Sequence, residues 1–139
     1  MPCEISWEPL GVYRRLYGIV SFKEIKDSIE EVGADPRFDE LRYSINDCSG
    51  IRGNEVSYAD LEYIAAVMYG QAKSNSRILI AIVMTDETAQ PLIERLRWLN
   101  VSPYAMQVFP TVVEARNWIE RELPIQDPLK DATPRTRTA

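Results

Sequence analysis

The segment of residues 77–84, with the sequence RILIAIVM, constrains the fold more than any other part of the chain. Its seven consecutive apolar residues leave no polar face, so a strand here must be covered on both sides. This pattern is typical of a central strand in a parallel sheet with helices on each face. The run is also far shorter than the roughly 20 apolar residues of a membrane-spanning helix. The segment therefore predicts a layered α/β domain with no membrane span.

Four other segments are predicted to be strands. Residues 3–8 alternate apolar and polar side chains, and residues 12–20 are rich in β-branched and aromatic residues. The short turn between these two segments favours an antiparallel hairpin. The remaining two strands are expected at residues 41–46 and 105–109.

Apolar residues at helical spacing, together with capping residues, predict four helices. Ser21 and Glu24 form a capping box before the first helix, and Gly33 is expected to end it. Ser57 caps the second helix, with Asp60 in its first turn. The four helices are expected at residues 21–33, 57–73, 88–99 and 111–123.

The predicted order is ββαβαβαβα, which indicates one α/β domain. Strands that alternate with helices form a mostly parallel five-stranded sheet, here with an antiparallel edge strand and four main helices. The polar, glycine-containing segment 47–55 and the DPRF segment 35–38 are interpreted as loops. Residues 124–139 contain three prolines, three threonines and scattered charge, so we expect a disordered tail. The domain is therefore expected to span residues 1–123.

The composition excludes several chemistries. The 139 residues include no histidine and two cysteines, Cys3 and Cys48, so Ser-His-Asp, Cys-His and four-thiolate zinc sites are impossible. The formal net charge of −5 argues against nucleic acid as a partner. We therefore expect a protein that is not an enzyme and has no metal or cofactor. The first 20 residues lack the apolar core of a signal peptide, which predicts a cytoplasmic protein with reduced thiols.

Several short segments, in this order and at this spacing, resemble those of STAS domains. They are GIVSF at 18–22, DPRF at 35–38, LRYSIND at 41–47, SYADL at 57–61, RILIAIVM at 77–84 and VFP at 108–110. Within that family, the chain most resembles an uncharacterised SpoIIAA-like branch, which is related in shape to the Sec14-type lipid-binding fold. The resemblance spans residues 3–123.

The resemblance implies a non-catalytic regulatory module that acts through a protein partner, as bacterial anti-sigma-factor antagonists do. The relation to the Sec14-type shape implies an alternative, a carrier of a small hydrophobic or lipid-like ligand. Seven tyrosines and three tryptophans fit either a pocket or the face of a homodimer. A closed apolar cavity would favour the carrier, and a solid core with a flat aromatic patch would favour the interaction module.

The resemblance also points to two serines. Regulated members of the family carry a phosphorylatable serine in an Asp-x-Ser-Gly element at the start of the helix after the third strand. Ser49 lies in matching letters, DCSG at 47–50, whereas Ser57 lies at the matching place. Each serine also has a simpler interpretation, since Ser57 can be only a helix cap and Ser49 only a turn residue.

Four other residues are candidates for a ligand site or an interface. Asp47 is expected at the carboxyl end of a strand, where α/β sheets bind ligands, although an Asx turn would explain it equally. Tyr58, Tyr63 and Tyr69 lie on or beside the apolar stripe of the second helix. Tyrosines of this kind line pockets, form dimer faces or belong to the core.

Overall fold

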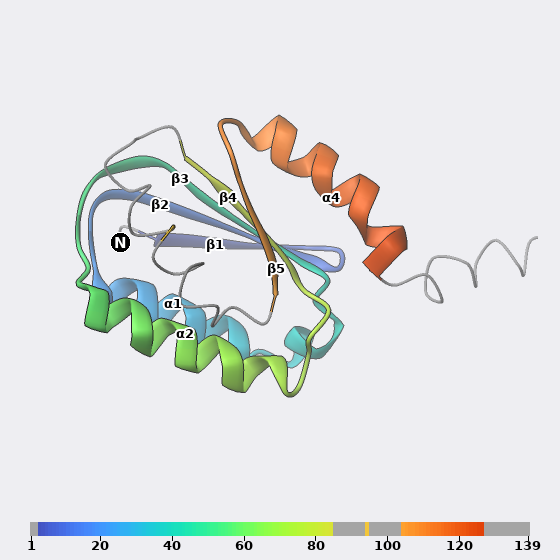
Figure 1. Ribbon diagram of the computed structural model, residues 1–139, viewed down its shortest axis with the longest axis horizontal. Helices are drawn as coiled ribbons and strands as arrows, with labels where there is room; N and C mark the ends of the chain where they lie inside the picture. Colours follow the sequence, from blue (N-terminus) through green and yellow to red (C-terminus); the bar gives the residue numbers. More distant parts are fainter. Residues whose placement is uncertain (1–2, 85–93, 95–103, 127–139) are drawn as a thin grey trace, which may run out of the picture.

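The computed structural model describes residues 3–84, 94 and 104–126 and has the layered α/β architecture expected from the sequence (Figure 1). Within these described residues, three helices pack on one five-stranded mixed sheet. The strands are β1 (Cys3–Glu8), β2 (Gly11–Ser21), β3 (Tyr43–Glu55), β4 (Leu79–Val83) and β5 (Ala105–Phe109). The helices are α1 (Phe22–Ala34), α2 (Tyr58–Ala72) and α4 (Val112–Gln126), with a short 3-10 helix, η1 (Pro36–Glu40).

The strands lie side by side in the order in which they occur in the chain. The order is β1-β2-β3-β4-β5, with β1 antiparallel to β2 and every other pair parallel. The predicted antiparallel edge hairpin is therefore confirmed. All five residues of β4 are buried, as the apolar run predicts, but β3 rather than β4 is the middle strand.

The two faces of the sheet are covered by different helices. Helix α1 connects β2 to β3 and α2 connects β3 to β4, and both lie on the same face (Figure 1). Parallel strands in sequential order place their right-handed crossover helices on one side, which explains this arrangement. Helix α4 covers the opposite face, where Ala115, Trp118 and Ile119 pack against β3 and β4.

The predicted loop at residues 47–55 is wrong, because these residues continue β3. They pair with β2 as far as Ser21 opposite Glu55, with register irregularities on either side of Tyr17 and Gly18. Gly18 has a φ of 72°, a conformation that glycine adopts without strain. Beyond Asp47, β3 has lost β4 as a neighbour, so this two-stranded extension needs few apolar residues. Its polar, glycine-containing composition therefore resembles that of a loop.

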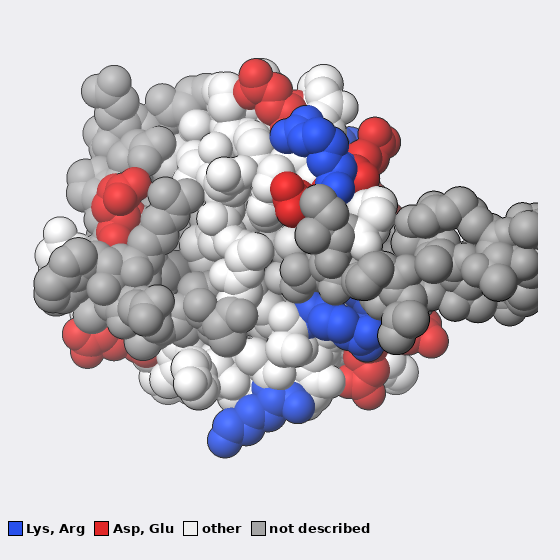
Figure 2. Space-filling model, turned by 45° about the vertical axis from the view of Figure 1, so that its right-hand side comes forward, with Lys and Arg blue, Asp and Glu red and all other residues white. Residues whose placement is uncertain are grey.

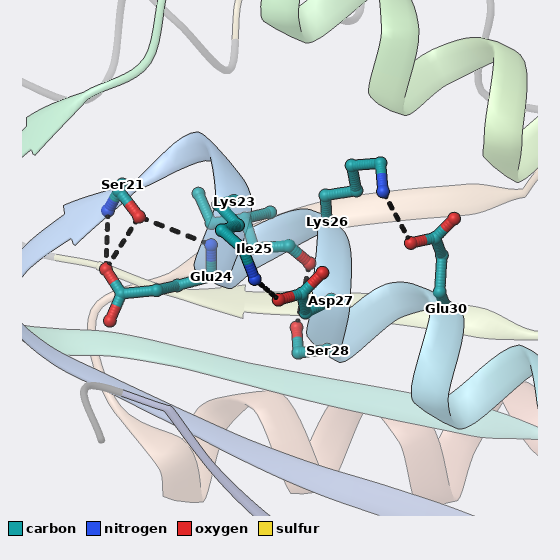
Figure 3. Close-up of polar contacts among 8 residues, drawn as sticks. All are labelled: Ser21, Lys23, Glu24, Ile25, Lys26, Asp27, Ser28 and Glu30. Carbon is teal, nitrogen blue, oxygen red and sulfur yellow. Dashed lines mark hydrogen bonds and ion pairs between the residues drawn. The ribbon is translucent and has the colours of Figure 1, made fainter.

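The start of α1 is confirmed in detail (Figure 3). The Glu24 amide donates to Ser21 Oγ at 3.3 Å, and Glu24 Oε1 accepts from the Ser21 amide at 3.0 Å. The helix continues one residue beyond Gly33 and ends at Ala34. Its Lys26–Glu30 ion pair, with an N···O distance of 2.8 Å, lies on the outer part of the helix, where such pairs add little stability.

Three other expectations need correction or lie outside the described residues. The expected loop at 35–38 leads into η1, because Asp35 accepts from the Arg37 amide and caps it. The helix expected at 88–99 lies outside the described residues apart from Glu94, which is helical. Helix α4 extends to Gln126, three residues into the expected tail. Pro124 is near its end and removes one backbone hydrogen bond. Residues 127–139 lie outside the described part.

Candidate functional site

A cavity separates the sheet from α1 and α2. It is partly open, has a volume of about 220 Å³ and lies inside the cluster of apolar residues on this face. For comparison, an apolar cavity of about 150 Å³ is enough to bind benzene. Its walls are mainly aliphatic and come from both helices and the sheet, including Leu16, Val20, Ile25, Ile29, Leu61, Ile64, Met68, Ile80 and Ile82.

One charged residue, Arg14, is among the described residues that line this cavity. It lies in the middle of β2, opposite Asn46 of β3, and 8% of its surface is exposed. Successive side chains of a strand point to opposite faces, so Arg14 shares its face with Val12 and Leu16. Those two neighbours are core residues, which places the guanidinium in an otherwise apolar environment.

All the hydrogen-bond partners of Arg14 among the described residues are uncharged. Its Nη1 donates to Asn46 Oδ1 at 2.8 Å, and its Nη2 donates to Ser28 Oγ. The Ser28 hydroxyl in turn donates its proton to the Ile25 carbonyl at 2.9 Å. The Arg14 Nε is buried without a partner. Figure 3 shows Ser28 on α1, the helix that supplies this contact.

The electrostatics of Arg14 follow from this environment. Burial lowers the pKa of the guanidinium, and the nearby thiols of Cys3 and Cys48 offset that effect in part. An arginine nevertheless remains protonated in a protein. No carboxylate within the described residues forms an ion pair with it. The cavity therefore contains a positive charge that the described chain does not neutralise.

Asp47, a predicted ligand contact, lies on the other face of the sheet. Its position is within β3, not at the end of the strand, because β3 is longer than expected. Tyr13 and Ser49 both donate to its carboxylate, the Ser49 hydroxyl at 2.6 Å. Burial alone would raise the pKa of Asp47, but the hydrogen bonds from Ser49 and Tyr13 outweigh it and the pKa is lowered. The carboxylate is thus occupied by the chain itself.

A second polar group on this face joins α4 to the sheet. Arg116 of α4 donates to both oxygens of Glu8, at 3.0 and 2.7 Å, and Tyr43 donates to Glu8 at 2.6 Å. The hydrogen bond from Arg116 is the main reason that the pKa of Glu8 is lowered. Burial, and then the bond to Glu8, raises the pKa of Tyr43 to about 12.

The two predicted serines have different structural roles. Ser57 is the N-cap of α2: its Oγ accepts from the Asp60 amide at 3.1 Å, and Asp60 Oδ2 accepts from the Ser57 amide at 2.9 Å. Ser49 is exposed on β3 and bonded to Asp47, so it is a strand residue and not a turn residue. The structure therefore brings Asp47 and Ser49 together and leaves Ser57 elsewhere.

The three predicted tyrosines are exposed on α2. The exposed fractions are 52% for Tyr58, 46% for Tyr63 and 57% for Tyr69. Tyr63 packs edge-on against Phe22 of α1, with 5.5 Å between the ring centres, so it helps to join the two helices. None of the three is among the described residues that line the cavity.

The sequence contained a signal for Arg14 that its interpretation missed. In the predicted strand 12–20, Arg14 falls in the same phase of alternation as Val12 and Leu16, two residues that any reading would bury. A charged residue in the buried phase of a strand is a candidate functional residue. Asn46 and Ser44 carry no comparable signal, because their segment alternates with apolar residues on the opposite face.

The surface carries charges of both signs. On the face drawn in Figure 2, uncharged side chains occupy a central area, and basic residues lie close to acidic ones around it. This differs from the clustered Lys and Arg of a nucleic-acid interface. In the described part of the chain, no helix is both long enough and apolar enough to cross a bilayer.

Comparisons with known proteins identify the architecture. No protein-family model matches the sequence, and no curated protein matches it. The unphosphorylated anti-sigma factor antagonist SpoIIAA superimposes with a TM-score of 0.57 at 9% identity, over 85% of this chain and 97% of that one. The chain has a SpoIIAA-like fold.

A second solved structure supports the same fold. It is an uncharacterised protein of the DUF3478 family from Shewanella loihica, itself described as SpoIIAA-like. Its TM-score is 0.55 at 14% identity, over 84% of this chain and 91% of that one. The STAS and SpoIIAA-like resemblance seen in the sequence is therefore confirmed as a likeness of fold. Within the SpoIIAA-like fold, the cavity lies under the two crossover helices.

Proposed function

We propose that this domain is a non-catalytic binding module that holds a small, mainly apolar molecule between its sheet and the helices α1 and α2. The observation that carries the proposal is the apolar cavity of about 220 Å³. Burial of apolar surface stabilises a complex by about 25 cal/mol per Å², so the entry of an aliphatic chain into the cavity is favourable. This function is the carrier that the Sec14-type shape implied.

The chemistry of the lining supports binding rather than catalysis. The described lining residues include no aspartate, glutamate or lysine, three of the groups that act as general acid or base in a chain without histidine. The thiol of Cys48 lines the cavity, but burial raises its pKa to about 11. A thiol with so high a pKa is protonated at neutral pH and is a poor nucleophile.

Two measurements test the proposal. Native mass spectrometry of the protein purified from its own host should show a bound small molecule. Octan-1-ol, at a concentration about ten times its Kd, should raise the Tm by about 3–5 °C. Val32→Phe fills the cavity from α1 and should abolish this shift, whereas Val113→Phe, at an exposed position of α4, should leave it unchanged. Absence of both the bound mass and the shift in the wild type would refute the proposal.

A second candidate function is a cytoplasmic regulatory module that binds a protein partner. The likeness to the anti-sigma factor antagonist SpoIIAA and the exposed start of α2 support it. Ser57 is exposed there, next to the exposed Tyr58, and Tyr63 and Tyr69 extend the same helix. These residues would form the partner surface or a homodimer face, and phosphate on Ser57 or Ser49 would regulate it.

Substitutions of Ser57 test this second candidate. If the serine is only a cap, Ser57→Ala should lower the free energy of unfolding by about 0.5–2 kcal/mol, and Ser57→Asp should retain most of it because aspartate also caps. Partner binding should then be equal for both variants once stability is corrected for. A regulatory serine would separate them, since the aspartate adds a charge and weakens binding. Phosphate on Ser57 in protein from the native host would favour regulation directly.

A further inference from the structure

We infer that the cavity selects a molecule that ends in a carboxylate, whose apolar chain lies along the aliphatic walls while Arg14 binds the carboxylate. This inference rests on the proposed function, because it names the chemical class of the ligand for the same cavity. It adds a requirement that cavity size and apolar walls do not impose, namely a single negative charge at one end of the ligand.

The first step of the argument is the state of Arg14 in the described chain. A buried charge is costly unless it is paired with an opposite charge and hydrogen-bonded. Arg14 is about nine-tenths buried, its partners Asn46 and Ser28 are neutral, and its Nε has no partner. An anion from outside the chain would supply both the missing charge and the missing acceptor.

The second step is the contrast with other arginines. Arg15, the next residue, points to the other face and forms an ion pair with Glu4 at 3.0 Å. Arg116 is paired with Glu8 in two hydrogen bonds. These two arginines are more exposed than Arg14, so each needs a counter-charge less than Arg14 does. The unneutralised charge therefore occurs at the one described arginine that lines the cavity.

The third step identifies the anion as a monocarboxylate. Arg14 is the sole charged side chain among the described lining residues, so the site neutralises one negative charge. A phosphate monoester carries about two charges at neutral pH and would bring an excess. A carboxylate carries one, and its two oxygens match the planar donor fork of a guanidinium. The aliphatic lining then accommodates the rest of the molecule.

The experiment compares ligands of equal chain length and different head groups. Isothermal titration of the wild-type protein at pH 7 should give octanoate about tenfold or more higher affinity than octan-1-ol, since hydrogen bonds to a charged group are the stronger ones. Octyl phosphate should bind more weakly than octanoate. Arg14→Met should reduce the ratio of the octanoate affinity to the octan-1-ol affinity to near one.

Two variants make the test specific. Arg15→Met removes a neighbouring charge from the opposite face and should preserve the wild-type ratio. Arg14→Lys keeps the charge, should preserve part of the preference for octanoate, and replaces Arg14→Met if that variant does not fold. Equal affinity of the wild type for octanoate and octan-1-ol would overturn this inference and leave the binding function intact. Tighter binding of octyl phosphate would overturn the monocarboxylate, and binding of none of the three would overturn the function itself.

Discussion

The two faces of the sheet treat polar groups in different ways. On the α4 face, Asp47 and Glu8 each accept hydrogen bonds from side chains of the chain, and Ala115 is completely buried. On the face under α1 and α2, Arg14 is buried with neutral partners beside a cavity. On the α4 face, the chain itself supplies the partners of the buried polar groups. On the other face, the described chain leaves a cavity unfilled and supplies no negative charge for Arg14. This difference fits the proposed function, in which the α4 face stabilises the fold and the α1/α2 face binds a ligand.

The largest expected effect compares two residues of β4 that point to opposite faces. Leu79 packs under α4 and is 1% exposed, whereas Ile82 borders the cavity. Each truncation to alanine should lower the free energy of unfolding by about 2–5 kcal/mol. The loss should be near the top of this range for Leu79→Ala and near the bottom for Ile82→Ala. Urea unfolding of the two variants measures this difference. A larger cost for Ile82→Ala would contradict the contrast between a solid face and a hollow one.

Removal of a buried charge from each face should have opposite outcomes. Asp47→Ala removes the acceptor of Tyr13 and Ser49, so the free energy of unfolding should fall by about 1.5–3 kcal/mol. Arg14→Met removes an uncompensated charge, so the free energy of unfolding should stay equal or rise. Chemical denaturation in the absence of ligand is the measurement. A loss for Arg14→Met as large as that for Asp47→Ala would show that the neutral partners already satisfy the guanidinium.

Addition of volume should also separate the faces. Ala115→Leu inserts a large side chain where none fits and should cost about 1–3 kcal/mol. Val32→Ile adds one methylene group toward the cavity and should raise stability by up to about 0.8 kcal/mol. Thermal unfolding of both variants tests this pair. Equal destabilisation would mean that the cavity has no room for added carbon.

The smallest effect concerns the pH dependence of the α4 face. The pKa of Tyr43 is raised to about 12 in the folded protein, above its unfolded value of about 10. Its stabilising contribution is therefore complete below pH 10 and is lost as the pH rises through about 12. Tyr43→Phe should cost about 0.5–1.5 kcal/mol at pH 7 and should weaken the alkaline loss of stability. Urea unfolding of wild type and variant from pH 8 to pH 12 provides the comparison, and identical pH profiles would contradict it.

Glu8, the hydrogen-bond partner of Tyr43, makes stability depend on pH in the opposite direction, at the acidic end. The lowered pKa of Glu8 means that its contribution is present above about pH 4.3, the unfolded value, and is lost as the pH falls through the lower folded value. Glu8→Gln should remove this part of the acid dependence. An unchanged acid limb of the pH profile would show that the Arg116 pair does not contribute.

The sequence predicted local structure better than it predicted the site. The apolar run 78–84, the capping box at Ser21, the cap at Ser57 and the hairpin predicted most elements, because each signal depends on nearby residues. The extension of β3 was missed because pairing with β2 is a tertiary interaction that overrides local glycine content. The burial of Arg14 could be predicted from its position in the alternation of β2, in phase with Val12 and Leu16. Its neutral partner Ser28, however, comes from a different element 14 residues away, and no spacing rule connects them.

Because the strands lie in the sheet in the same order as in the chain, each strand can pair with its neighbour as soon as it leaves the ribosome. Chains emerge from the amino terminus, and β1 to β4 with α1 and α2 precede β5 and α4. The two helices that lie over the cavity are therefore synthesised before α4, the helix that covers Leu79, Ala81 and Val83. Until α4 emerges, the nascent chain exposes that apolar surface, and exposed apolar surface favours aggregation. Of the described helices, α4 is thus the last to be made and the one that covers this apolar surface.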